Sequence, residues 1–190
     1  MKPIASQDYY ELSSAQKRLY VIHELNKDDT SYNMPVIEEI SGTFDVARCM
    51  KAIKQVVNRH EAFRTSFELR DEKTVQIIHE EVDLPIEYQE ADEEEAKNIV
   101  NHFIRPFDLA KAPLLRVGII KISNEKHILM IDMHHIISDG LSMDVFVKEF
   151  LLLYQGETLE PLKLQYKDYC AWQNELLNSE QMRTQEKILA

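Results

Sequence analysis

Cysteine is scarce in this sequence, and the two cysteines present carry no recognisable pattern. Cys49 and Cys170 lie far apart and match neither a metal-ligand spacing nor a redox spacing. Because no signal peptide begins at Met1, a reduced, cytoplasmic setting without bound metal is the simpler interpretation. Only four glycines and six prolines occur in 190 residues, which excludes fibrous repeats and argues against disorder.

Basic residues are also in short supply. The chain has 22 lysines and arginines against 33 acidic residues, for a net charge of -11. Nucleic acids and anionic membranes both require a basic face, so neither is an expected partner. No apolar run approaches the roughly 20 residues that span a bilayer. The 44% hydrophobic content instead favours one globular domain, since a chain of this length buries roughly 70% of its unfolded surface.

Five helices are predicted where a capping residue precedes apolar residues at helical spacing. The first follows a capping box of Ser13 and Gln16, and it would bury Ala15, Leu19 and Ile22. The other four are expected after Asp45, after the capping box Asp92–Glu95, after Ser142 as N-cap, and from Tyr166 to Leu177.

Strands are predicted where β-branched and apolar residues cluster between turn residues. The segments are Met34–Gly42, Phe63–Leu69, Val75–His79, Leu114–Ile122 and Lys126–Met133. The acidic segment Glu87–Glu95 is expected to be a solvated face. Because the elements lack the regular spacing of βαβ units, we expect an α+β domain with helices packed on a largely antiparallel sheet.

The most informative stretch follows the last of these strands, where His134 and His135 are succeeded by an Asp139–Gly140 turn. Successive side chains of a strand point to opposite faces, so the two histidines cannot share one task. One imidazole would face the interior, and the other would stand at the end of the strand. A helix N-terminus follows at once and offers free backbone N–H groups near His135.

Other chemistries fit this stretch less well. A zinc site needs two or three further ligands, and adjacent strand residues face opposite sides. A serine hydrolase would need a Gly-x-Ser-x-Gly elbow, which the sequence lacks, as it lacks a glycine-rich phosphate loop. Arg59 and Arg64 flank a strand entrance, and an arginine would be the best partner for Asp139 in a buried turn.

Together these residues resemble the condensation domains of nonribosomal peptide synthetases. Residues 134–140 match the HHxxxDG motif, and residues 59–67 resemble the motif RHExLRTxF, with Phe63 where leucine is usual. Residues 12–20, 106–109 and 166–173 resemble further segments of the family. The motifs occur in order across nearly the whole chain.

This resemblance implies a chloramphenicol-acetyltransferase-like two-layer sandwich. Residues 1–178 would form the N-terminal lobe of a condensation domain, and residues 179–190 a polar C-terminal tail or the start of the connection between lobes. The partner of this lobe would be the C-terminal lobe, which the sequence does not contain, and the isolated lobe is expected to be inactive.

The resemblance also implies an activity and its residues. Family members form an amide bond between an acceptor amine and a donor thioester, each held on the 4'-phosphopantetheine of a peptidyl carrier protein, with no cofactor or metal bound to the domain itself. By motif position, the catalytic motif residues are His134, His135, Asp139 and Gly140. His135 would be the active-site histidine, and His134 would pack and form hydrogen bonds. Asp139 would pair with Arg64, and Gly140 would keep the backbone close to the reacting atoms.

Two alternatives remain open. The first is a stand-alone acyltransferase that uses coenzyme A, although in such enzymes the motif lies near the C-terminus and here about 50 residues follow it. The second is a non-catalytic module that docks carrier proteins, against which the intact motif argues.

Overall fold

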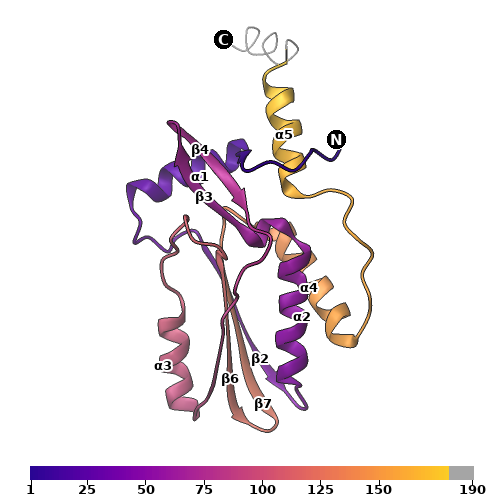
Figure 1. Ribbon diagram of the computed structural model, residues 1–190. Coiled ribbons are helices and arrows are strands. Elements are labelled where there is room, and N and C mark those ends of the chain that lie inside the picture. The colour runs from indigo at the N-terminus through magenta and orange to yellow at the C-terminus, as the bar shows by residue number, and fades with distance from the viewer. Residues whose placement is uncertain (180–190) are drawn as a thin grey trace.

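The computed structural model describes residues 1–179 and forms two sheets flanked by helices (Figure 1). Only Ser179 of the predicted tail 179–190 falls within that range, so the tail lies outside the described residues. In chain order the elements are β1 (Tyr10–Glu11), α1 (Ser14–Leu25), β2 (Asn33–Ser41), α2 (Val46–Arg59), the 3-10 helix η1 (Glu61–Arg64), β3 (Thr65–Arg70), β4 (Lys73–Ile78), β5 (Ile86–Glu90), α3 (Glu93–Phe103), β6 (Leu115–Ser123), β7 (Lys126–His134), α4 (Gly140–Gln155) and α5 (Tyr166–Leu177).

The larger sheet has the strand order β2-β7-β6-β5 and the smaller one β1-β4-β3. Every pairing is antiparallel except that of β5 with β6. The predicted α+β class with a largely antiparallel sheet is therefore confirmed. The strand β7 occupies an interior position of the larger sheet, between β2 and β6, so its C-terminal end is held from both sides.

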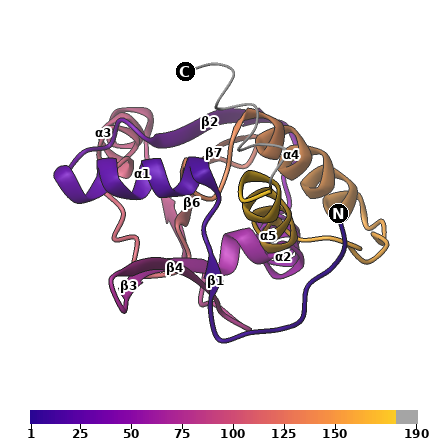
Figure 2. The same cartoon turned by 90° about the horizontal axis from the view of Figure 1, so that it is seen from above.

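The two faces of the larger sheet are covered by different helices. Leu129, Ile131 and Met133 of β7 belong to the main core, which α2 and α4 complete. Met130 and Ile120 point the other way and pack with α3. The side chains of β7 thus alternate as a pleated strand requires. Figure 2 shows α3 and α4 on opposite sides of the sheet.

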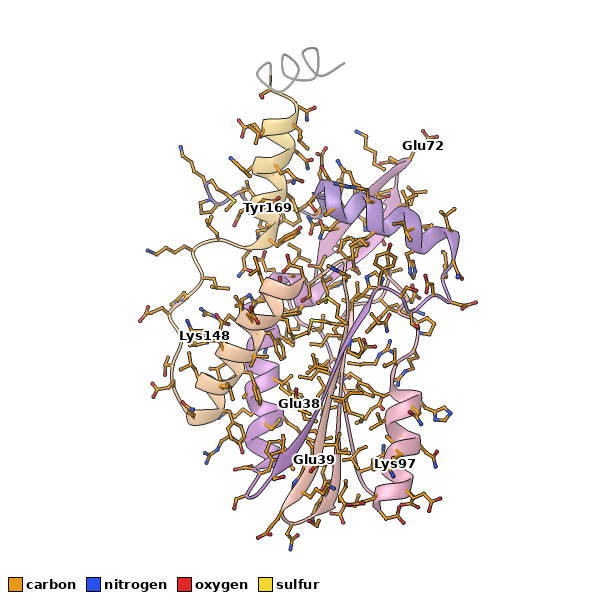
Figure 3. The ribbon with its side chains drawn as sticks, turned by 180° about the vertical axis from the view of Figure 1, so that it is seen from behind. Glu38, Glu39, Glu72, Lys97, Lys148 and Tyr169 are labelled. Atoms are coloured by element: carbon orange, nitrogen blue, oxygen red, sulfur yellow. The ribbon has the colours of Figure 1, made fainter. Side chains whose placement is uncertain are left out.

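The edge strand β2 carries charge along its outer part. Glu38 and Glu39 are exposed on this strand, and Pro35 is tolerated there because an edge strand has one unpaired side. Figure 3 shows both glutamates at the rim of the sheet. Charged residues and proline on an edge oppose its pairing with another sheet.

The predicted buried face of the first helix is only partly correct. Its capping box is present as expected, and Leu19 is half-buried and packs against the main core, but Ala15 and Ile22 are exposed, whereas Gln16 and His23 are buried. The physical reason is that α1 packs across the end of the larger sheet. There it meets main-chain groups and an imidazole instead of an apolar sheet face, so polar side chains are the ones enclosed.

Two local predictions need correction. Part of the acidic segment Glu87–Glu95 forms β5, a parallel edge strand whose residues 87–90 are all exposed. With no buried side chain alternating along it, the pattern of a strand is missing. In addition, Phe63 and Arg64 belong to η1, so the next strand begins only at Thr65.

Candidate active site

His135 stands just past the end of β7, and the main chain around it is fixed by hydrogen bonds. Its backbone N–H donates to the carbonyl of Tyr32 over 2.8 Å, and that of His134 donates to Leu114 over 3.0 Å. A turn begins at once, because the N–H of Ile137 donates to the carbonyl of His134. The imidazole of His135 is exposed, so a rigid strand end presents a free ring.

His134 is buried and has a different role. Its Nδ1 accepts a hydrogen bond from the N–H of Ile136 at 3.1 Å, and the rings of His23 and Phe107 meet it edge-on. Burial lowers the pKa of His134 to about 4. The ring is therefore neutral at pH 7, with the proton on Nε2, and it braces the turn after β7. As predicted, it packs and accepts a hydrogen bond; its inclusion among the catalytic residues is not supported, because the ring is enclosed and away from the pocket beside His135.

The low pKa of His134 predicts a pH-dependent stability. The folded value, about 4, lies below the ordinary 6.5, so between these pH values the unfolded chain binds a proton that the fold rejects. The neutral ring of His134 therefore contributes fully to the free energy of unfolding above pH 6.5. This contribution, about 3 kcal/mol, is lost as the pH falls toward 4. His134→Asn keeps an acceptor for the N–H of Ile136 but cannot titrate. We expect urea unfolding of this variant to depend less on pH across that window.

His102 provides the control for this measurement, since it is exposed on α3. His102→Asn should leave the pH dependence as in the wild type. An unchanged slope in His134→Asn would contradict the assignment of this effect to the buried ring.

Asp139 caps α4, in place of the predicted Ser142. Its Oδ1 accepts from the backbone N–H of Ser142 at 2.8 Å and from the Ser142 hydroxyl at 2.7 Å. These two bonds, the hydroxyl first, hold the pKa of Asp139 below its usual range. Both residues are favoured caps. The turn after β7 puts Asp139 in the extended conformation that a cap requires, whereas Ser142 is already helical.

The predicted ion pair between Asp139 and Arg64 is wrong. The guanidinium of Arg64 donates to the carbonyls of His79 and Glu80, so it ties η1 to the segment after β4. Among residues 1–179, Arg64 forms no ion pair within 4 Å. Asp139 is exposed and already has Ser142 as its donor, so it needs no buried cation.

A double-mutant cycle tests this correction. Asp139→Ala removes an N-cap and should lower the free energy of unfolding by about 1 kcal/mol. Because Arg64 lies elsewhere, its replacement by alanine should add to that loss independently, within about 0.5 kcal/mol. Chemical denaturation of the two single variants and the double variant measures the coupling. A coupling energy above about 1 kcal/mol would show that Asp139 and Arg64 interact and would contradict this correction.

Gly140 has neither a strained backbone nor a crowded one. Its φ is not in the left-handed region, and a Cβ at this position would meet no atom of the described chain within 4 Å. The turn therefore does not itself require glycine. The space beside Gly140 is unoccupied by any described residue.

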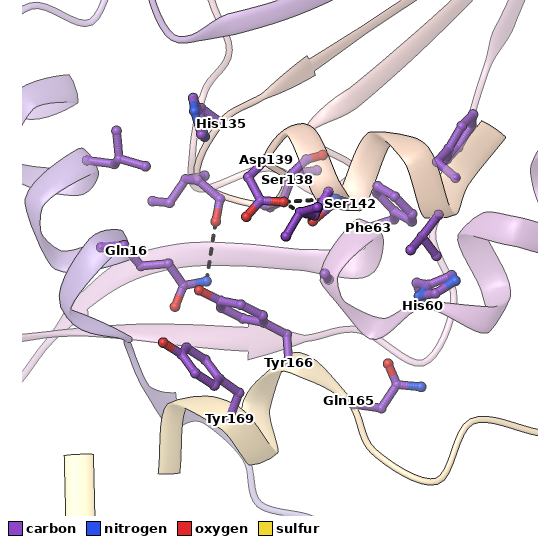
Figure 4. Close-up of a pocket in the computed structure, with 18 of the residues that line it drawn as sticks. Gln16, His60, Phe63, His135, Ser138, Asp139, Ser142, Gln165, Tyr166 and Tyr169 are labelled. Carbon is purple, nitrogen blue, oxygen red and sulfur yellow. Dashed lines mark hydrogen bonds between the residues drawn. The ribbon is translucent and has the colours of Figure 1, made fainter. Parts of the chain in front are cut away.

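A cavity of about 540 Å³ opens beside His135 and Asp139 (Figure 4). Four elements line it, and most of the side chains that they contribute are apolar. From α1 come Ala15, Gln16 and Leu19; from around η1 His60, Ala62 and Phe63; from the turn and α4 residues 135–139, Leu141, Ser142, Val145 and Phe146; and from the segment into α5 Leu162, Leu164, Gln165, Tyr166 and Tyr169.

Two glutamines fasten the walls of this cavity to one another. The amide of Gln16 donates to the carbonyl of Ile136 at 3.3 Å, so α1 holds the turn that carries His135. Gln165 accepts from the N–H of Glu61 and donates to the carbonyl of Arg59, so the start of α5 holds η1. The sequence indicated Gln16 only as a local cap, because nothing in its neighbourhood shows a contact across 120 residues.

His60 is a second imidazole in the cavity, at the end opposite His135 in Figure 4. Its Nε2 lies 2.7 Å from the carboxylate of Glu149 on α4, which Arg59 also contacts at 3.0 Å. The carboxylate thus holds both residues of the predicted Arg59–His60 motif against α4. This pair closes one end of the cavity and leaves His135 as the cavity imidazole that makes no side-chain hydrogen bond among the described residues.

The described part of the chain contains neither a metal-binding cluster nor a membrane-spanning helix. No group of three or more histidine, cysteine or acidic side chains within residues 1–179 is arranged to hold a metal ion. In the same part of the chain, no helix combines the length and apolar character needed to cross a bilayer.

Superposition on solved structures places this fold in a known structural class. The X-domain complexed with OxyB from teicoplanin biosynthesis superposes with a TM-score of 0.85 at 26% identity, over 95% of this chain and 41% of that one. The starter condensation domain of rhizomide synthetase gives 0.83 at 20% identity, over 96% and 47%. The predicted chloramphenicol-acetyltransferase-like fold, which such domains share, is confirmed.

Sequence comparison gives the family. The Condensation domain model matches residues 6–187, so the chain belongs to the condensation-domain family of nonribosomal peptide synthetases. Surfactin synthase subunit 1 of Bacillus subtilis (strain 168) is 49% identical over 187 residues, which are 98% of this chain and 5% of that protein. Tyrocidine synthase 3 of Brevibacillus parabrevis is 46% identical over 98% of this chain and 3% of its own length. The chain thus spans a small fraction of these relatives.

Proposed function

We propose that this chain is the histidine-bearing lobe of a domain that forms peptide bonds between carrier-bound substrates. The amine of the acceptor attacks the donor thioester, a C–N bond forms, and the C–S bond breaks. The donor's 4'-phosphopantetheine leaves as a thiol and takes up the proton lost by the amine. The observation that carries the proposal is the exposed ring of His135 beside a 540 Å³ cavity. The synthetases that share 46–49% of its residues support it.

His135 is the group that we assign to the reacting amine. A neutral imidazole can accept the proton of the attacking nitrogen and return it to the departing sulfur. Asp139 acts as a positioning residue, because its hydrogen bonds to Ser142 start α4 and so shape the turn that bears His135. The substrates arrive on peptidyl carrier proteins, and the domain needs no cofactor of its own. We place the reaction in the cytoplasm, where the buried free thiols of Cys49 and Cys170 stay reduced.

We further propose that residues 1–190 by themselves do not catalyse the reaction. Two of the solved domains that they resemble are more than twice as long, since this chain aligns with 41% and 47% of them. A second lobe is needed to enclose the cavity and to guide both phosphopantetheine arms to His135.

The test is a condensation assay with two loaded carrier proteins. A protein that joins these residues to the C-terminal lobe of a relative should transfer the donor to the acceptor carrier, as mass spectrometry of the carriers would detect. The 190-residue chain alone should give no product above background. Absence of transfer by the joined protein, with both carriers loaded and the protein folded, would contradict the proposal.

A docking module is the second candidate, favoured by one observation. The structural relative at TM-score 0.85 was solved in complex with another protein, OxyB. If the chain served only to dock a partner, the joined protein would bind loaded carriers in the same assay without transferring the donor group.

A further inference from the structure

The cavity beside His135 has walls that are apolar on several sides. Leu19 of α1, Phe63 of η1, Val145 of α4 and Leu164 before α5 all line it. Apolar surface of this kind favours a ligand by roughly 25 cal/mol for each Å² removed from water. A volume of about 540 Å³ is in the range of cavities that take small molecules, and it exceeds what one catalytic group needs.

Most polar side chains in the cavity are already engaged within the protein. Gln16 and Gln165 bond to main-chain groups, Asp139 to Ser142, and His60 to Glu149. Apart from the second carboxylate oxygen of Asp139, these groups have little hydrogen-bonding capacity left for a ligand.

Two polar groups at the His135 end remain uncommitted among the described residues. The ring of His135 makes no side-chain hydrogen bond, and the hydroxyl of Ser138 is buried without any hydrogen-bond partner. A buried hydroxyl without a partner costs about 1–3 kcal/mol, which a ligand group would offset if the side chain turned toward the cavity. Ser138 itself lines the cavity. The polar, reacting part of a substrate therefore belongs at this end.

The charge of the lining decides what the rest of the cavity accepts. No lysine or arginine of residues 1–179 lines it, and its carboxylate is that of Asp139. A carboxylate on a substrate would thus lose water without gaining a cation, and it would lie near a like charge. Buried charges without partners are strongly disfavoured.

We infer that this cavity selects a substrate whose side chain is uncharged and apolar, of the leucine or phenylalanine type, and that it excludes acidic side chains. This inference rests on the proposed function and names the substrate class for the same site. The reacting carbonyl and amine lie toward His135 and Ser138, and the side chain lies among Leu19, Phe63 and Val145.

Binding to the 190-residue chain tests the inference without requiring turnover. The probes are leucyl, glutaminyl and glutamyl groups joined to pantetheine through an amide, which cannot transfer the acyl group. Glutamine matches glutamate in size but carries no charge, so the three probes separate shape from charge. In an NMR titration we expect the leucyl probe to bind at least tenfold more tightly than the glutamyl probe, with the glutaminyl probe between them.

A positive charge introduced into the cavity lining should reverse part of this order of probe affinities. Val145→Lys puts a cation on the lining and should raise the affinity for the glutamyl probe at least tenfold, while weakening the leucyl probe. Val147→Lys is the matched control, because Val145 and Val147 are 45% and 42% exposed on the same helix and only Val145 lines the cavity. The control should leave the order of all three probes unchanged.

Equal affinities for the three probes, or failure of the leucyl probe to bind at millimolar concentration, would overturn the inference. So would an equal effect of the two lysine variants, since the effect would then come from overall charge. Because no bond is made or broken, these outcomes are independent of the condensation assay. Selective binding by the 190-residue chain, together with no condensation by the joined two-lobe protein, would overturn the proposed function and leave the substrate class standing.

Discussion

Replacing His135 by alanine in the joined two-lobe protein should lower the condensation rate about 100- to 10,000-fold, the range typical of lost general-base catalysis. The ring is exposed, and the contact that fixes this residue is made by its backbone N–H to Tyr32. The substitution should therefore leave the melting temperature unchanged. The measurement is the single-turnover rate of transfer between loaded carriers.

A second substitution separates proton transfer from positioning. The amide of His135→Gln can form a hydrogen bond but cannot accept a proton at neutral pH. If His135 is the base, the glutamine variant should be as slow as the alanine variant. A glutamine variant within tenfold of the wild type would instead make His135 a positioning residue. His102→Ala, on the far helix α3, should keep the full rate and controls for the loss of any histidine.

Removing the guanidinium of Arg116 should give the largest loss of stability, about 3–5 kcal/mol at pH 7. Arg116 lies 3.4 Å from the carboxylate of Asp132, which is fully buried on β7 two residues before His134. The guanidinium also stacks over the ring of Phe107 at 3.8 Å. It donates in addition to the carbonyls of Phe103, Arg105 and Pro106. Arg116→Ala strands a buried carboxylate and releases the segment after α3, as urea unfolding would measure.

The double variant identifies the cause of this loss. Burial raises the pKa of Asp132, so its charged form is already disfavoured in the fold. In the wild-type protein the amide of Asn33 donates to the carboxylate of Asp132 at 2.7 Å. Asp132→Asn removes the charge and still offers an oxygen to that amide. We expect the protein with Arg116→Ala and Asp132→Asn to be more stable than the one with Arg116→Ala alone. If it is not, lost packing on Phe107 accounts for the effect.

Local signals explain the part of the fold that could be predicted. The capping boxes at Ser13 and at Asp92, and the cap at Asp45, are all present. The strand pair of β6 and β7 also agrees with the prediction to within one residue at each end. These features depend on residues within a few positions of one another, where side-chain hydrogen bonds and apolar periodicity act directly.

The wrong predictions share a different cause. The pairing of Asp139 with Arg64 and the buried face of α1 both concern segments that meet only after folding. The edge strand β5 has exposed side chains throughout, so only its backbone pairing with β6 identifies it. The choice of Asp139 over Ser142 as cap depends on where the turn after β7 ends. Each outcome was decided by the position of an element on the sheet.

The order of residues by itself determined most of the elements and the family motifs. It also determined the opposite orientations of His134 and His135, because adjacent residues of a strand must face opposite sides. Only the tertiary structure decided the site around them. It brought Gln16 to the turn, gave Arg64 other partners, and left the cavity mostly apolar, with no lysine or arginine of residues 1–179 in its lining. The physical reason is that burial and desolvation depend on which distant segments pack together, and these set the charge and shape that a substrate meets.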